Sequence, residues 1–120
     1  MLPPIYTWLK ASNAVKAIIG NTPRAYRPGD APQDVTQPYV TWALVAGVPD
    51  NQLSSTPPSD RYTVQVDCWH TTDKGVEDLA KAVRNAIEPN AHLTAIPVNN
   101  RDPETKLYRI ALQFDVLQTR

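Results

Sequence analysis

The sequence is poor in the residues that build disulfides, metal sites and phosphate sites. It contains a single cysteine, Cys68, so an internal disulfide is impossible, and it has no Cys/His cluster to anchor a structural zinc ion. Its four glycines are isolated from one another, which excludes a glycine-rich nucleotide-binding loop. No cofactor is therefore predicted, and the lone thiol favours a reducing compartment.

Net charge and long apolar runs are also missing. Twelve Lys and Arg residues balance twelve Asp and Glu residues, so no overall field attracts nucleic acid or an anionic membrane. The apolar stretches are far shorter than the ~20 residues that a membrane-spanning helix requires. Residues 1–4 have neither a basic segment nor a long apolar segment, so we expect no signal peptide. These absences argue against a membrane protein and against an avid nonspecific DNA-binding protein.

The chain does contain enough apolar residues for one folded domain. Its 120 residues fall within the size range of a single domain, and 42% of them are hydrophobic. We therefore expect a single domain over residues 1–120. Proline is over-represented, with 12 copies against a usual share of about 5%. The prolines lie mainly between segments of regular pattern, where they mark the ends of elements.

Apolar residues at helical spacing predict two helical regions. The first begins after a pair of prolines near the N-terminus and continues, as one bent helix or two abutting helices, to a left-handed stop at Gly20. The second is capped by Thr72, and its apolar stripe ends at Ile87, just before Pro89. Both regions are amphipathic, so each should pack one side against a core.

Alternation of apolar and polar residues predicts the strands. Residues 39–48 have apolar side chains at every even position, which predicts a strand with one buried face. Residues 62–68 and 108–116 alternate in the same way. Residues 92–98 form a weaker strand, which Pro97 confines to a sheet edge or to a strand end. The first two long strands follow one another and are expected to pair antiparallel.

The remaining segments are predicted to be loops. Residues 22–38 contain four prolines and should form a loop arm without backbone partners of its own, apart from a short strand over residues 25–27. Residues 49–60 are polar and longer than a hairpin turn requires, so we expect a projecting loop. Residues 99–103 should turn the chain between the last two strands.

These elements predict an α+β fold, a two-layer sandwich. It consists of a mainly antiparallel sheet of about four to five strands, with two helices packed on one face. The opposite face of the sheet then carries polar side chains that need water or a polar partner. These side chains are Thr63, Gln65, Asp67, Arg109, Gln113 and Asp115. Function is expected on this bare face and on the long loops.

Few residues could support catalysis, and no catalytic residue is predicted. His70 and His92 stand outside the spacings of metal ligands and of activated nucleophiles. Cys68 lies on the apolar side of its strand, where a thiol is usually a small buried hydrophobic group. Asp67 and Asp115 could imitate a carboxylate pair, but their polar neighbours favour a solvated or ion-paired face.

Aromatic residues offer candidate contact surfaces. Trp69 falls on the polar side of its strand, so it either packs beneath a loop or anchors an interface. Trp8 and Trp42 share the apolar sides of their elements and are expected to meet in the core. Tyr26 lies with Arg24 and Arg27 in a small basic patch that is well below the footprint of a nucleic-acid-binding module.

Four segments, in their order and spacing, resemble a known family. They are QPYVTW at residues 37–42, DRYTVQVDCWH at residues 60–70, VEDLAKAVR at residues 76–84 and RDPETKLYRIALQFDV at residues 101–116. The chain resembles the tail completion proteins of tailed bacteriophages and prophages, also called tail terminators or head-to-tail joining proteins. The resemblance extends over nearly the whole chain, and the family's order of elements matches the one predicted above.

The resemblance implies a structural protein and not an enzyme. Members similar to lambda-type tail terminators form a ring, expected here to be a hexamer, which caps the tail tube and stops its polymerisation. The ring also presents an attachment surface to the head-completion (connector) protein, and DNA passes through its channel without specific binding. The resemblance also implies that the protein is assembled in the bacterial host cytoplasm and lies at the head–tail junction of the virion. The alternatives are another connector or head-closure component or, from a different class, a small α+β ligand-binding domain or enzyme.

A closed ring needs two different surfaces on each chain, because each copy contacts its neighbours head to tail. The expected interface residues lie on the arm, on the projecting loop and on the sheet face: Arg24, Tyr26, Arg27, Asp30, Asn51, Leu53, Trp69 and Arg109. We expect the loop to contact the tube or the connector. A channel that lets a polyanion slide should have a neutral or acidic wall, for which Asp67 and Asp115 are candidates.

Overall fold

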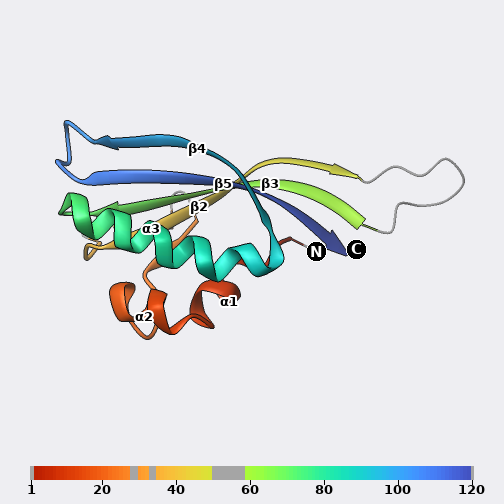
Figure 1. The fold of residues 1–120 in the computed structure, drawn as a ribbon, viewed down its shortest axis with the longest axis horizontal. Helices are drawn as coiled ribbons and strands as arrows, with labels where there is room; N and C mark the ends of the chain where they lie inside the picture. The colour runs from red at the N-terminus through yellow and green to blue at the C-terminus, as the bar shows by residue number, and fades with distance from the viewer. Residues whose placement is uncertain (1, 28–29, 33–34, 50–58, 120) are drawn as a thin grey trace, which may run out of the picture.

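One layer of the molecule is a five-stranded sheet, and the other layer consists of helices packed on one face of that sheet (Figure 1). The structure is a computed structural model that describes residues 2–27, 30–32, 35–49 and 59–119. In chain order, the elements are α1 (Ile5–Lys10), α2 (Asn13–Ile19), β1 (Ala25–Tyr26), β2 (Tyr39–Pro49), β3 (Ser59–His70), α3 (Asp73–Ile87), a 3-10 turn (Glu88–Asn90), β4 (His92–Arg101) and β5 (Tyr108–Thr119). The predicted α+β sandwich and the order of its elements are confirmed.

Local capping explains where the helices begin and end. The Ser12 hydroxyl accepts a hydrogen bond from the backbone N–H of Val15 at the start of α2, so the first helical region is two abutting helices. Gly20 ends α2 with a φ of 99°, a left-handed conformation that glycine adopts without strain. Thr72 caps α3 in the same way as Ser12, because its hydroxyl accepts from the backbone N–H of Gly75 at 3.0 Å.

The sheet has the strand order β1-β2-β3-β5-β4. The short β1 pairs parallel with the start of β2, and all other neighbours pair antiparallel. The outermost position of β4 agrees with the edge strand that Pro97 predicts. β4 continues to Arg101, however, so the predicted turn at residues 99–103 is wrong. The turn begins at Asp102, whose carboxylate accepts from the backbone N–H of Glu104 and thereby supports it.

The core lies between the helices and one face of β3 and β5. Its sheet side consists of alternate residues of the two strands: Tyr62, Val64, Val66, Cys68, Ile110, Leu112, Phe114 and Val116. α3 contributes the predicted stripe, and α1 and α2 contribute Ile5, Leu9, Val15 and Ile19. Trp8 and Trp42 pack against this core from half-buried positions, so neither is a fully buried core residue.

The predicted buried face of β2 is correct only at its start. Val40 is fully buried, but Leu44, Ala46 and Val48 are exposed, contrary to the even-position pattern. The pairing with β3 shifts register between Leu44 and Ala46, which reverses the sides that the later residues take. The sheet also extends beyond the helices at this end, so no second layer covers it (Figure 1).

Part of the proline-rich arm forms backbone hydrogen bonds with the rest of the fold. β1 pairs with Val40 and Thr41, the Arg24 N–H donates to the Ile19 carbonyl, and the Arg24 carbonyl accepts from the Val40 N–H at 2.9 Å. The expectation that the arm lacks internal backbone partners is therefore wrong for residues 24–26. The reason is that β1 adds to the open edge of β2, which sequence alternation alone does not reveal.

Candidate functional site

Three residues form a row across the open face of the sheet. Tyr39 on β2, Trp69 on β3 and Arg109 on β5 are direct cross-strand neighbours. The rings of Tyr39 and Trp69 stack, with centroids 6.0 Å apart and planes 13° from parallel. The guanidinium carbon of Arg109 lies 5.1 Å from the centre of the Trp69 ring, within cation–π range. The row thus combines two aromatic surfaces and a cation on one exposed face.

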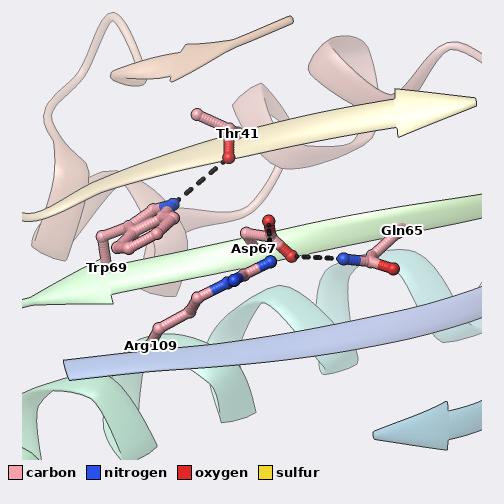
Figure 2. Close-up of polar contacts among 5 residues, drawn as sticks. All are labelled: Thr41, Gln65, Asp67, Trp69 and Arg109. Atoms are coloured by element: carbon pink, nitrogen blue, oxygen red, sulfur yellow. Dashed lines mark hydrogen bonds and ion pairs between the residues drawn. The ribbon is translucent and has the colours of Figure 1, made fainter. Parts of the chain in front are cut away.

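Polar contacts hold this row in place (Figure 2). The indole Nε1 of Trp69 donates to the Thr41 hydroxyl at 3.2 Å. Arg109 Nη2 donates to Asp67 Oδ2 at 2.9 Å, and the Gln65 side-chain amide donates to the other carboxylate oxygen at 3.0 Å. The Asp67 side chain is 16% exposed and that of Arg109 is 29% exposed, so water still reaches the pair. The contacts fix the directions of the side chains and leave the surface accessible.

Trp69 lies on the open sheet face between Tyr39 and Arg109. Whether it anchors an interface, one of its two predicted roles, stays a prediction. Burial, with a smaller effect from the Asp102 carboxylate, raises the pKa of Tyr39 above its ordinary value. The uncharged hydroxyl that Tyr39 presents at the end of the row therefore persists to a more alkaline pH than that of an ordinary tyrosine.

Asp67 and Asp115 lie on the same face but do not form a carboxylate pair. Asp67 is opposite Ala111 in the ladder, and Asp115 is opposite Thr63, so they are four residues apart along the strands, or about 13 Å. Each carboxylate has its own partners, and the Thr63 hydroxyl donates to Asp115 at 3.1 Å. The ion-paired face that the sequence favoured is confirmed for Asp67. The channel-wall role of both residues stays a prediction.

The arm residues occupy different environments. Arg24 points inward, where its Nε donates to the Pro38 carbonyl at 3.0 Å and its Nη2 to the Ile18 carbonyl at 3.4 Å. Arg27 is exposed, with its guanidinium carbon 5.3 Å from the centre of the Trp42 ring. Tyr26 is half-buried in β1, and Asp30 is exposed. Arg24 therefore joins the end of α2 to the start of β2, whereas Arg27 and Asp30 are available to a neighbour.

Two predicted contact residues, Asn51 and Leu53, lie outside the described residues. Their proposed contact with a tube or connector stays a prediction. Within the described part of the chain, no helix is long and apolar enough to cross a membrane. The same part contains no group of three or more His, Cys, Asp or Glu side chains arranged to hold a metal ion.

His70 and Cys68 occupy structural positions, whereas His92 is exposed at the start of β4. Cys68 is fully buried, as predicted, and this burial is the main cause that raises the pKa of its thiol. His70 ends β3, and its Nδ1 accepts from the backbone N–H of Thr72. A Cβ atom at Gly75 would lie only 2.3 Å from the His70 ring, so glycine there allows the ring to pack on the first turn of α3. Sequence reasoning missed this role of Gly75, because the contact depends on tertiary structure.

The surface hollows do not gather a catalytic set. One groove, about 210 Å³ in volume, lies between α3 and the β4–β5 part of the sheet. Its lining combines apolar side chains with a charged rim: Glu77, Ala80, Lys81, Arg84, Ile96, Asn99, Ile110 and Leu112. Neither histidine lines this groove, and neither does Cys68. His92 borders a second hollow of about 270 Å³ with Arg84, Glu88, Ala91 and Leu93, a lining without a Ser, Thr, Cys or Lys nucleophile. The candidate site is therefore a set of contact surfaces on a rigid sheet.

The fold is an α+β sandwich with one sheet face covered by helices and the other left open. The family model for tail completion protein gp17 matches residues 3–119, so the chain belongs to this family of virion structural proteins, which are not enzymes. A solved structure titled "Virion of native gene transfer agent (GTA) particle" is similar, with a TM-score of 0.72 and 14% identity over 97% of this chain and 92% of that one. No curated protein matches the chain in sequence.

Proposed function

We propose that copies of this protein form a ring, expected to be a hexamer, that caps the tail tube and stops its polymerisation at the head–tail junction. The observation that carries this proposal is the match of nearly the whole chain, residues 3–119, to a tail completion family. Two further features support it. The open sheet face presents a preordered row, Tyr39, Trp69 and Arg109, and the opposite side of the molecule is closed by helices.

The proposed ring has two kinds of contact. Each copy touches its neighbours through two different surfaces, as head-to-tail closure requires. The flat ends of the ring touch the tube on one side and the head-completion protein on the other. We assign Asn51 and Leu53 to one of these end contacts and the exposed arm residues Arg27 and Asp30 to a contact between copies. DNA passes through the centre, where Asp67 and Asp115 would repel a phosphate backbone.

The test is a tail assembly reaction in which tubes polymerise with and without the purified protein. We expect tubes without it to continue growing and tubes with it to stop and to acquire a terminal ring visible by electron microscopy. Capped tubes should then join to heads. A matched preparation of portal-bearing capsids distinguishes the alternative, since a head-closure component would bind capsids and leave tube growth unchanged. Binding to capsids alone would contradict the tail-terminating function.

A further inference from the structure

Large exposed apolar side chains gather at the two margins of the sheet. Val45 and Val48 on β2 are 57% and 56% exposed, and Ile96 on β4 is 51% exposed. Leu44 on β2 and Leu117 near the end of β5 are also exposed. Among the described residues, the sixth large exposed apolar side chain is Leu2. Four of these six side chains therefore lie on β2 and β4, away from the polar row on the sheet face.

The strands β2 and β4 are nearly free of charge. Residues 35–49, which include all of β2, contain no Asp, Glu, Lys or Arg, and β4 carries only Arg101 at its end. The inner strands β3 and β5 carry the other charged residues of the sheet, including Asp67 and Arg109. Monomeric proteins usually place charges on edge strands to prevent them from pairing with other chains. The strands of this sheet have the opposite arrangement. The described charges beside β2 come from the arm, where Arg27 lies over Trp42 and, with Asp30, borders a hollow next to Ala43 and Leu44.

The backbone at these margins is open within the described residues. β1 pairs with β2 only at Val40 and Thr41, so the remaining seven-residue outer edge of β2, residues 42–48, has no strand beside it. β4 pairs with β5 on one side and has no described strand on the other. Figure 1 shows both strands at the sides of the sheet. Open N–H and C=O groups on an edge strand can accept another strand.

The directions of the two edges fit each other. Because β2 is antiparallel to β3, β3 to β5 and β5 to β4, the strands β2 and β4 run in opposite directions. When copies are arranged head to tail around an axis along the strands, the β2 edge of one copy meets the β4 edge of the next in antiparallel orientation. Antiparallel pairing is slightly the more stable per residue, and such a contact between unlike surfaces can close a ring.

We propose that the free edge of β2, over residues 42–48, pairs with the free edge of β4 of a second copy of this chain, so that the sheets of neighbouring copies join. This inference rests on the ring proposed above and names its contact surface. The second copy fits because one chain carries both uncharged margins with exposed aliphatic side chains and opposite strand directions. Joining the sheets would bring both margins to the seam between copies, with Val45 and Val48 on its open-face side and Ile96 of the next copy on its helix side.

The test places a carboxylate on one margin at a time, with Val48→Glu on β2 and Ile96→Glu on β4. Arg61 is the cross-strand neighbour of Val48, and Lys81 and Arg84 share a groove with Ile96, so each carboxylate has a cation nearby in the monomer. Both variants should fold, as checked by circular dichroism. Ala17→Glu, at an exposed position of α2, is the matched control. Each margin variant should self-associate about 10-fold or more weakly than the wild type, because pairing of the margins would remove the carboxylate from water.

Mixing the two variants gives the decisive measurement by native mass spectrometry. Each variant retains one intact margin, and the two intact margins are complementary, so an equimolar mixture should form heterodimers and no rings. A twofold β2-to-β2 contact would instead leave Ile96→Glu fully associated. Rings from either single variant, or a wild type that remains monomeric alone and on tail tubes, would overturn the edge pairing. If the variants form rings and cap tubes normally, only the edge pairing is overturned. If wild-type rings form but do not affect tube growth, the proposed function is overturned.

Discussion

At the scale of single residues, Cys68 shows how burial changes chemistry. The thiol lies in the core, where desolvation, followed by the nearby Asp67 carboxylate, raises its pKa above the ordinary value of 9.0. The folded protein therefore keeps the thiol protonated at a pH at which the unfolded chain already ionises. The residue behaves as a hydrophobic group and not as a nucleophile, in agreement with its place on the apolar side of β3.

The raised pKa predicts a loss of stability at alkaline pH. The stabilising effect is fully present below pH 9, the ordinary value, and declines above it as only the unfolded chain ionises. The free energy of unfolding should fall by up to about 1.4 kcal/mol per pH unit from this group alone. Urea unfolding of the wild type and of Cys68→Ala, measured from about pH 8 to about pH 10, gives the pH dependence of the free energy of unfolding for each protein. Equal slopes in the two proteins would contradict the assignment.

At the scale of elements, Arg24 connects the helical layer to the sheet. Its guanidinium donates to the Ile18 carbonyl at the end of α2 and to the Pro38 carbonyl just before β2. The sequence prediction grouped Arg24 and Arg27 with Tyr26 in one small basic patch. Successive residues of a strand point to opposite sides, but which arginine points inward depends on the parallel pairing of β1 with β2.

The two arginines should therefore respond differently to truncation. We expect Arg24→Ala to lower the free energy of unfolding by about 1.5–3 kcal/mol, because hydrogen bonds to a charged group are lost. Arg27→Ala should cost only about 0.5–1 kcal/mol, the range of an exposed cation–π contact, while weakening contacts between copies. Chemical denaturation and sedimentation measure the two effects. A destabilised Arg27→Ala beside an unchanged Arg24→Ala would show that the structural roles are reversed.

Sequence patterns could predict most elements but not their surroundings. The apolar stripe of α3 and the alternation of β5 were sufficient to predict which of their side chains are buried, because these side chains face one continuous core. β2 has the same alternation, yet its second half is exposed, since a register shift at Leu44 and the limited length of the helices decide burial there. For the site, the phase of Trp69 and Arg109 correctly placed them on the open face. Their stacking with Tyr39 depends on strand register, which residue spacing does not define.

At the scale of the whole molecule, the balance of charges predicts a low affinity for DNA. The 12 basic and 12 acidic residues cancel, and Arg109, one of the cations on the open face, is paired with Asp67. Phosphate binding depends on cations that release counterions, so few such contacts are available. This property suits the proposed passage of DNA through a ring, where tight binding would oppose movement.

We accordingly expect no salt-dependent binding of the purified protein to duplex DNA. Fluorescence anisotropy with a labelled duplex, at several salt concentrations, should show no appreciable change on addition of wild-type protein. The variant Asp67→Asn frees the Arg109 cation and provides a sensitive comparison, since it should bind slightly more tightly at low salt. Strong wild-type binding that weakens steeply with salt would contradict a non-gripping channel and favour a nucleic-acid-binding function.

The hydrogen bonds of Arg24 have a mechanical consequence. Its guanidinium binds carbonyls of both layers, so α2 and the adjoining part of the sheet should move as a rigid body when the protein docks. The end of the sheet that reaches past the helices has no such brace (Figure 1). If the protein docks between two different neighbours as proposed, we expect this end of the sheet to adjust by changes in twist that leave the hydrophobic core undisturbed.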